Sequence, residues 1–99
     1  MSQQFEWDAA KAVTNIKDHR VGFEEALAVF ADPLARIFAD PDHSADEARE
    51  VIIGHSTQTR LIVVAFTERD DKIRIISARE VTARERRDYE ENTPKSEGR

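Results

Sequence analysis

Residues 49–78, REVIIGHSTQTRLIVVAFTERDDKIRIISA, decide the fold of this chain. They contain three apolar runs, at 49–55, 60–67 and 72–78, which short polar turns separate. The run at 60–67 is apolar on both faces, which favours a central strand. Because connections this short join antiparallel neighbours, the stretch predicts a meander. A further short strand is expected at 34–38, which gives a four-stranded antiparallel sheet.

The residues before this sheet predict two helices. Asp8 is a suitable N-cap for the first helix, and apolar residues then recur at helical spacing. These residues are Ala9, Val13 and Ile16. The second helix, over 23–30, ends before Pro33, because a residue that precedes proline disfavours the α conformation. Both helices are expected to cover one face of the sheet. Residues 4–6 could form an additional strand.

The C-terminal part predicts one more helix, which a capping box over residues 82–85 opens. This helix extends to about Glu91 and is nearly all polar apart from Ala83 and Tyr89. With so little apolar surface it either rests loosely on the sheet or docks on another molecule. The sequence therefore predicts a single α+β domain over residues 1–91 and a disordered tail over residues 92–99.

The composition excludes several classes of protein. With 99 residues the chain has room for one sheet and a few helices, but not for a large cofactor cleft. It has no cysteine, which excludes a disulfide scaffold, a thiolate zinc site and a cysteine nucleophile. No Gly-rich phosphate or dinucleotide loop is present. Residues 1–4 do not resemble a signal peptide, and no apolar stretch approaches the ~20 residues of a membrane helix. We therefore expect a cytoplasmic protein without a membrane contact.

The net charge of −5 conceals an uneven distribution. Residues 1–50 carry 5 basic and 11 acidic side chains, whereas residues 69–87 carry seven basic and four acidic ones. A basic patch can therefore lie on an acidic molecule and attract an anion. The alternative is an ordinary solvated surface of mixed charge.

Two groups of polar residues are candidates for a functional site. Lys11, Asn15 and His19 are spaced i, i+4, i+8 and share one polar helix face. His19 also has a plainer interpretation, as a histidine that the helix dipole favours in a last turn. On the sheet, four cations could line one face: Lys72, Arg74, Arg79 and Arg49. Four cations on one face are costly unless an anion is bound, which indicates phosphate, although such residues are often plain surface.

The remaining histidines and the single tyrosine leave alternatives open. His43 lies in an acidic stretch, 40–47, that could hold a metal ion or form a solvated loop. The stretch lacks the glycine and the ligand spacing of a calcium loop. His55 ends a predicted strand and is expected at the surface. Tyr89 is either the packing anchor of the third helix or a catalytic residue. We expect no metal and no cofactor.

Several motifs in one order, over residues 5–91, resemble the BrnT toxin family. They are Phe5-Glu6-Trp7-Asp8, Asn15-Ile16-Lys17-Asp18-His19, Phe23-Glu24-Glu25-Ala26, Phe30-Ala31-Asp32-Pro33-Leu34, Asp42-His43-Ser44, Ile53-Gly54, Ile73-Arg74-Ile75-Ile76-Ser77-Ala78-Arg79 and the segment from Thr82 to Tyr89. One departure follows His19, where this chain has Arg20 and the family usually has glycine.

The resemblance implies a RelE-like fold and a toxin that arrests growth by cleaving RNA. Metal-free cleavage of RNA needs a base for the ribose 2′-hydroxyl, an acid for the leaving oxygen and cations for the charged phosphorane. The expected catalytic residues are Lys11, His19, Arg49, Arg79 and Tyr89, with His19 or Lys11 as acid or base. The expected RNA-binding residues are Lys72, Arg74, Arg84 and Arg87. The resemblance also places family polar positions at Asn15 and Ser77.

The resemblance also implies a partner. This would be a BrnA-like antitoxin, a ribbon-helix-helix protein that neutralises the toxin and represses their shared operon. Operator DNA would then be contacted only through the antitoxin. Two alternatives stay open: a non-catalytic binding module in a complex with a DNA-binding regulatory partner, and a metal-dependent nuclease that uses residues 40–47.

Overall fold

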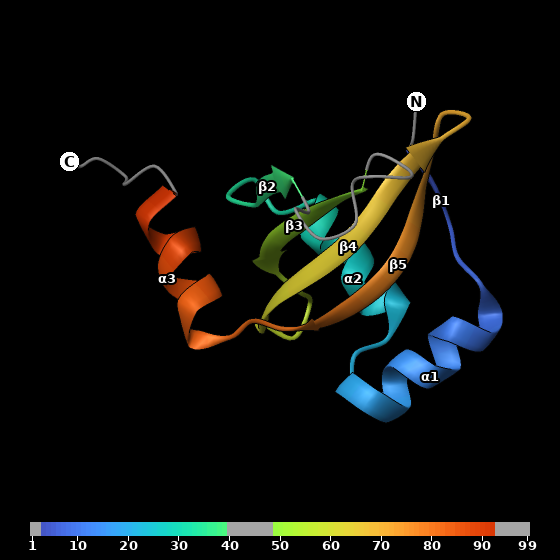
Figure 1. Ribbon diagram of the computed structural model, residues 1–99, viewed down its shortest axis with the longest axis horizontal. Helices are drawn as coiled ribbons and strands as arrows, with labels where there is room; N and C mark the ends of the chain where they lie inside the picture. The colour runs from blue at the N-terminus through green and yellow to red at the C-terminus, as the bar shows by residue number, and fades with distance from the viewer. Residues whose placement is uncertain (1–2, 40–48, 93–99) are drawn as a thin grey trace.

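The computed structural model describes residues 3–39 and 49–92, which form an α+β domain of three helices and one sheet (Figure 1). The elements in chain order are β1 (Gln4–Glu6), α1 (Ala9–His19), α2 (Phe23–Phe30), β2 (Arg36–Ala39), β3 (Arg49–His55), β4 (Leu61–Arg69), β5 (Lys72–Glu80) and α3 (Ala83–Asn92). None of the helices in these residues is long and apolar enough to cross a bilayer.

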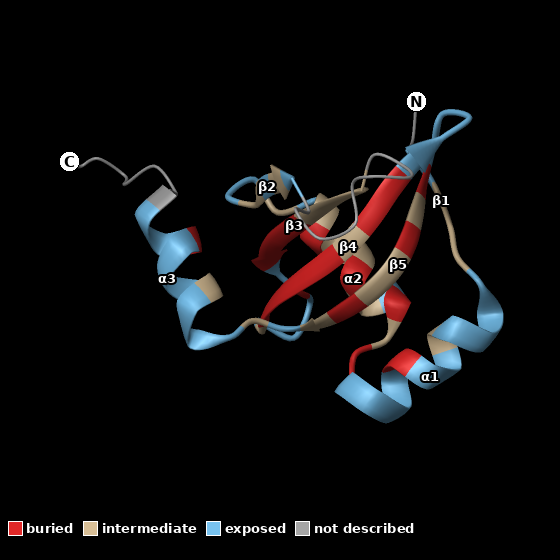
Figure 2. Ribbon diagram, viewed as in Figure 1, coloured by how far each residue is buried: buried red, intermediate tan, exposed pale blue. Residues whose placement is uncertain are grey.

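The sheet has five strands in the order β1-β5-β4-β3-β2. The meander of β2 to β5 is antiparallel and β4 is central, as predicted, with buried residues along most of its length (Figure 2). The expectation of a four-stranded, purely antiparallel sheet is wrong, because β1 adds a fifth strand that pairs in parallel with the start of β5. A strand of only three residues shows no reliable alternation, so its partner could not be inferred from the sequence.

Helix α2 covers one face of the sheet, as Figure 1 shows behind β3 and β4. Its residues Phe23, Ala26 and Val29 pack with the apolar side chains of the sheet in the main core cluster. The contact is close at Gly54 of β3, where an added Cβ would lie 2.9 Å from the Ala35 Cβ. Such a separation is tighter than packed carbon atoms adopt, so glycine is required there.

Helix α1 lies along the β5 border of this face, and its orientation differs from the prediction. The expected apolar stripe points to solvent, with Val13 69% and Ile16 53% exposed. Instead the helix turns Asn15 inward, where the side chain is 6% exposed. The Asn15 Nδ2 donates to the carbonyl oxygens of Val21 (2.8 Å) and Ala78 (2.7 Å), and its Oδ1 accepts from the Ala78 amide (3.1 Å). Two of these bonds satisfy the Ala78 backbone of β5 beyond the end of β1, and the third satisfies the carbonyl of Val21. Asn15 is therefore the residue that α1 buries.

A charged network ties the turn after α1 to the end of the sheet. Arg20 closes α1 in the left-handed conformation, with φ 59° and ψ 33°. The Arg60 guanidinium donates to the Arg20 carbonyl oxygen at 3.0 Å and to both carboxylate oxygens of Glu25, at 2.6 and 3.1 Å. These bonds to Arg60 lower the pKa of Glu25, although burial opposes the shift.

Helix α3 begins with the predicted capping box. The Glu85 amide donates to the Thr82 hydroxyl at 3.1 Å, and the Thr82 amide donates to the Glu85 carboxylate at 2.9 Å. Most of the helix is exposed, but Tyr89 is only 5% exposed. It packs on the sheet face opposite α2, so its predicted role as the anchor of α3 is confirmed. The helix ends at Asn92, and the remainder of the predicted tail lies outside the described residues.

Candidate functional site

The strand register aligns the side chains of the face opposite α2 into rows. One row across β3, β4 and β5 is Arg49, Thr67 and Arg74, and the next is Val51, Ala65 and Ser77. A third row is Arg36, Ile53, Val63 and Arg79, which begins on β2. We call this surface the α3 face, because Tyr89 of α3 packs on its Ile53, Leu61 and Val63.

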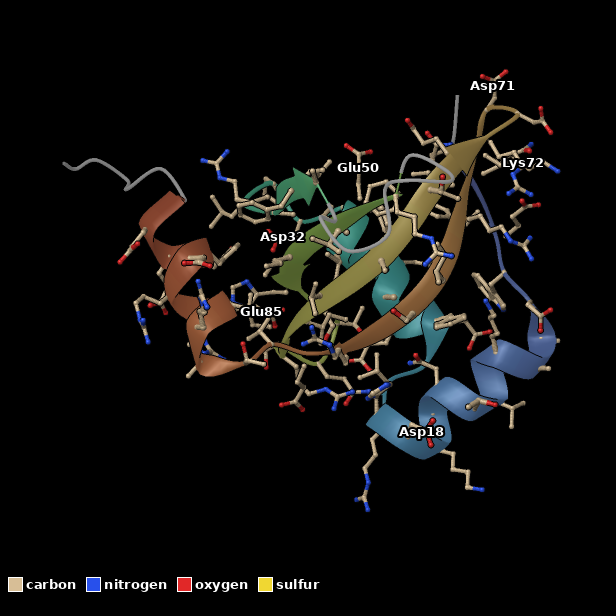
Figure 3. The ribbon with its side chains drawn as sticks, viewed as in Figure 1. Asp18, Asp32, Glu50, Asp71, Lys72 and Glu85 are labelled. Carbon is tan, nitrogen blue, oxygen red and sulfur yellow. The ribbon has the colours of Figure 1, made fainter. Side chains whose placement is uncertain are left out.

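The end of the α3 face remote from α3 is cationic. Arg49 and Arg74 flank the buried Thr67, and the next pair toward the β4–β5 turn is Arg69 and Lys72. Figure 3 shows Lys72 at this turn, at the opposite end of β5 from Glu85. The Arg74 Nη1 lies 3.5 Å from the carboxylate of Glu6 on β1. The predicted grouping of Arg49, Arg74 and Lys72 on one face is therefore seen in the register.

Arg79 lies at the other end of the face and is engaged by α3. Its Nη1 and Nη2 donate to the two carboxylate oxygens of Glu85, each at 2.8 Å. These bonds hold the pKa of Glu85 below its usual value, although burial opposes the shift. Arg79 therefore uses for Glu85 the same two N–H groups with which it would bind a phosphate. Arg79 lies on the sheet face where it was predicted, but Glu85 competes with a phosphate for its guanidinium.

The predicted helix group lines a groove between α1 and β5. The groove has a volume of about 290 Å³, and Lys11, Asn15 and His19 form one wall while Ile76 of β5 forms the other. Ile76 is placed by a register shift in the β4–β5 pairing, where bulges commonly redirect a side chain. The Asn15 amide is committed to the backbone, but Lys11, His19 and Asp18, which also lines the groove, offer groups for chemistry there.

Asp8 links the groove to the cationic end of the face. Backbone hydrogen bonds from Lys11 and Ala10 are the main cause of its lowered pKa, and the charges of Lys11 and Arg74 lower it further. Lys11 and Arg74 therefore act on the same carboxylate. The remaining predicted cations, Arg84 and Arg87, are exposed on α3.

The sequence analysis missed two residues beside the α3 face. Asp32 contacts the ring of His55, with 3.4 Å between the Asp32 Oδ2 and the His55 Nδ1. Arg36 shares the row of Arg79, and its Nε is buried without a hydrogen-bond partner among the described residues. The contact between Asp32 and His55 joins residues 23 positions apart, so no local pattern indicates it.

The metal-site alternative rested on His43 and residues 40–47, which lie outside the described residues. Within residues 3–39 and 49–92, no group of three or more His, Asp or Glu side chains is arranged to hold a metal ion.

The structure is a small α+β domain with arginines on one sheet face, a side chain whose fork matches phosphate oxygens. Comparison with known proteins gives the family. The family model described as "Ribonuclease toxin, BrnT, of type II toxin-antitoxin system" matches residues 7–85. The crystal structure of the Brucella abortus ribonuclease toxin, BrnT, is similar with a TM-score of 0.66 and 26% sequence identity. The similarity covers 82% of this chain and 99% of that one. No curated protein shows a significant match.

This chain therefore belongs to the BrnT family of ribonuclease toxins of type II toxin–antitoxin systems. The predicted resemblance is confirmed, and with it the ribonuclease class and the existence of an antitoxin partner. The alternative of a non-catalytic binding module gains no support.

Proposed function

We propose that the α3 face is the surface on which this toxin binds and cleaves RNA, without a metal ion. The observation that carries the proposal is the row in which Arg49 and Arg74 flank Thr67. Two strand spacings separate the arginines by about 10 Å. Guanidinium groups so placed can bind one phosphate from two sides through forked hydrogen bonds.

The proposed roles follow the position of each residue. Lys72 and Arg74 bind the RNA backbone at the cationic end, and Arg84 and Arg87 extend the basic surface along α3. The proposed catalytic residues are Lys11, His19, Arg49 and Arg79, whereas Tyr89 is buried as the anchor of α3. The arginines stabilise the phosphorane through forked hydrogen bonds, and Arg79 does so after Glu85 releases it. Lys11 and His19 remain the proton-transfer candidates that the sequence suggested.

We also propose the finer features of the biology. The toxin is cytoplasmic and has a RelE-like fold, and its partner is a BrnA-like ribbon-helix-helix antitoxin that alone contacts operator DNA. The antitoxin covers the basic surface of residues 69–87 with acidic side chains, so that it inhibits by occlusion. Their association should weaken as salt rises, because exposed charge pairs are screened.

RNA binding by single variants tests this surface. The probe is a 2′-O-methyl oligonucleotide, which lacks the nucleophile and so reports binding alone. Arg74→Ala should bind about tenfold more weakly, and its salt dependence should flatten by about 0.7 in log–log slope, the contribution of one phosphate contact on a single strand. Lys17→Ala is the matched control, since Lys17 is exposed on α1 but does not line the groove. Equal affinity of the two variants would place the RNA elsewhere.

A further inference from the structure

His55, which was expected only at the surface, is contacted on its ring by two residues from other parts of the fold. Its backbone amide donates to the Asp32 Oδ2 at 2.8 Å, and its ring Nδ1 lies 3.4 Å from the same oxygen. On the other side, the Tyr89 ring packs against the imidazole with centroids 6.0 Å apart and planes at 76°. Figure 3 shows Asp32 beside β3. The imidazole is therefore fixed in orientation by residues from α3 and from the segment after α2.

The Asp32 carboxylate is suited to this orienting role. Burial of the group favours protonation, but hydrogen bonds from the backbone amides of His55 and Leu34 and from the His55 ring outweigh it, so the pKa of Asp32 lies below its usual value. The Asp32 side chain is 12% exposed, whereas that of His55 is 48% exposed. A shielded anion at Nδ1 leaves the other ring nitrogen, Nε2, for a substrate in solvent.

Arg36 supplies a cation near this histidine. Arg36 pairs with Ile53, and His55 lies two residues further along β3, which puts their Cα atoms about 8 Å apart. The Arg36 Nε is buried without a hydrogen-bond partner among the described residues. The side chain as a whole is only half-buried, and a phosphate oxygen is the acceptor that an arginine fork best matches.

The groove that Lys11 and His19 line lies far from His55. His55 pairs with Leu61, and Ser77, next to the groove-lining Ile76, pairs with Ala65. Two strand spacings and four residues along β4 therefore separate His55 from Ser77 by about 16 Å. A general base at His55 therefore takes the place of Lys11 and His19 in proton transfer, because one residue cannot span this distance.

We propose that His55, oriented by Asp32 and next to Arg36, is the general base of the ribonuclease reaction. This proposal rests on the proposed function and names the catalytic residue of that activity. In such a carboxylate–histidine pair, the carboxylate fixes the tautomer of the histidine and stabilises the imidazolium that forms. His55 would be the catalytic residue and Asp32 a positioning residue.

The step conserves atoms and charge. The Nε2 of neutral His55 takes the proton of a ribose 2′-hydroxyl, whose oxygen forms a bond to the adjacent phosphorus. The bond from phosphorus to the 5′ oxygen breaks, and that oxygen takes a proton from water. The imidazolium returns its proton to the resulting hydroxide. The products are a 2′,3′-cyclic phosphate and a 5′-hydroxyl, and Arg36 binds the phosphate oxygens throughout.

The test measures cleavage of an RNA oligonucleotide between pH 5 and 9 by the full-length chain and three variants. His55→Gln should lower kcat by about 100-fold or more, the usual contribution of a general base, with a small effect on KM. It should also abolish the pH dependence of kcat between pH 5 and 8, which a structural role would not do. His19→Gln should keep the shape of that pH profile. Thr57→Ala, an exposed neighbour in the β3–β4 turn, is the control that should behave as the parent.

A second measurement guards against a variant that simply misfolds. Added imidazole should restore part of the rate of His55→Ala, because the free base can enter the vacated position. If His55→Gln keeps the parental kcat and pH profile while Arg74→Ala loses RNA binding, the base assignment is overturned and the proposed RNA surface stands. If the parent itself does not cleave RNA, the proposed function fails, and the assignment of His55 fails with it.

Discussion

Replacement of Asn15 should damage the fold rather than the chemistry. In Asn15→Ala, three buried backbone groups lose their partner: the carbonyl oxygens of Val21 and Ala78 and the Ala78 amide. Each unsatisfied group costs about 1–3 kcal/mol, and partial access of water at the sheet border favours the low end. We therefore expect a loss of about 3–4 kcal/mol, a large part of the roughly 5–15 kcal/mol that stabilises a domain.

Urea unfolding measures this loss directly. Trp7, the one tryptophan of the chain, packs edge-on against Phe23 at 5.9 Å between ring centroids, so its fluorescence reports the packing of the N-terminal segment. With a slope of about 1 kcal/mol per molar urea, the midpoint should fall by about 3 M. Thr14→Ala is the matched control on the same helix, since Thr14 is exposed, and its midpoint should change little.

The isosteric variant Asn15→Asp adds a test of the hydrogen-bond directions. An aspartate keeps the acceptor for the Ala78 amide but turns a negative charge toward two carbonyl oxygens. Burial and these oxygens raise the pKa of the introduced carboxyl group, so the variant should regain stability relative to the parent as the pH falls. If Asn15→Ala loses cleavage while its urea midpoint stays parental, Asn15 belongs to the chemistry and this reasoning is refuted.

Three further predictions concern other parts of the fold. Arg20→Gly should stabilise the protein by about 0.5–1 kcal/mol, since glycine adopts the left-handed conformation without strain; an unchanged thermal midpoint would contradict this, and Arg20→Ala is the control. Glu85→Gln should free Arg79 and strengthen binding of the 2′-O-methyl oligonucleotide several-fold; weaker binding would show that the pair with Glu85 positions Arg79 instead. The carboxylates of Glu25 and Glu85 have lowered pKa values, so the stability they contribute is full above about pH 4.5 and is lost as the pH falls further. The free energy of unfolding of Glu25→Gln should therefore fall less steeply below about pH 4.5 than that of the parent. An equally steep fall would refute the contribution of Glu25.

The sheet could be predicted further than the helices. The apolar runs gave β3, β4 and β5 and the central place of β4, because burial on both faces leaves a direct trace in the sequence. The orientation of α1 could not be predicted from hydrophobicity, because the hydrogen bonds of Asn15 outweigh the burial of Val13 and Ile16.

Part of the candidate site could also be predicted from the sequence, and part could not. Strand alternation was enough to place Arg49 and Arg74 on one face, since residues of equal parity share a side. The contact of Asp32 with His55 and the fork between Arg79 and Glu85 depend on where loops and α3 fold back onto the sheet. Such non-local pairs leave no spacing in the sequence from which to infer them.

The most direct test of the central claim is the cleavage of RNA by the purified chain in excess EDTA. The parent should cleave single-stranded RNA at the same rate with and without the chelator, and Lys17→Ala should match it. Arg74→Ala should lose transition-state stabilisation of roughly 2–4 kcal/mol, which is about 30- to 1,000-fold in kcat/KM, while its urea midpoint stays near that of the parent. Activity that disappears in EDTA and returns with magnesium or manganese would contradict the metal-free account, and a parental rate for Arg74→Ala would remove the cationic end of the α3 face from it.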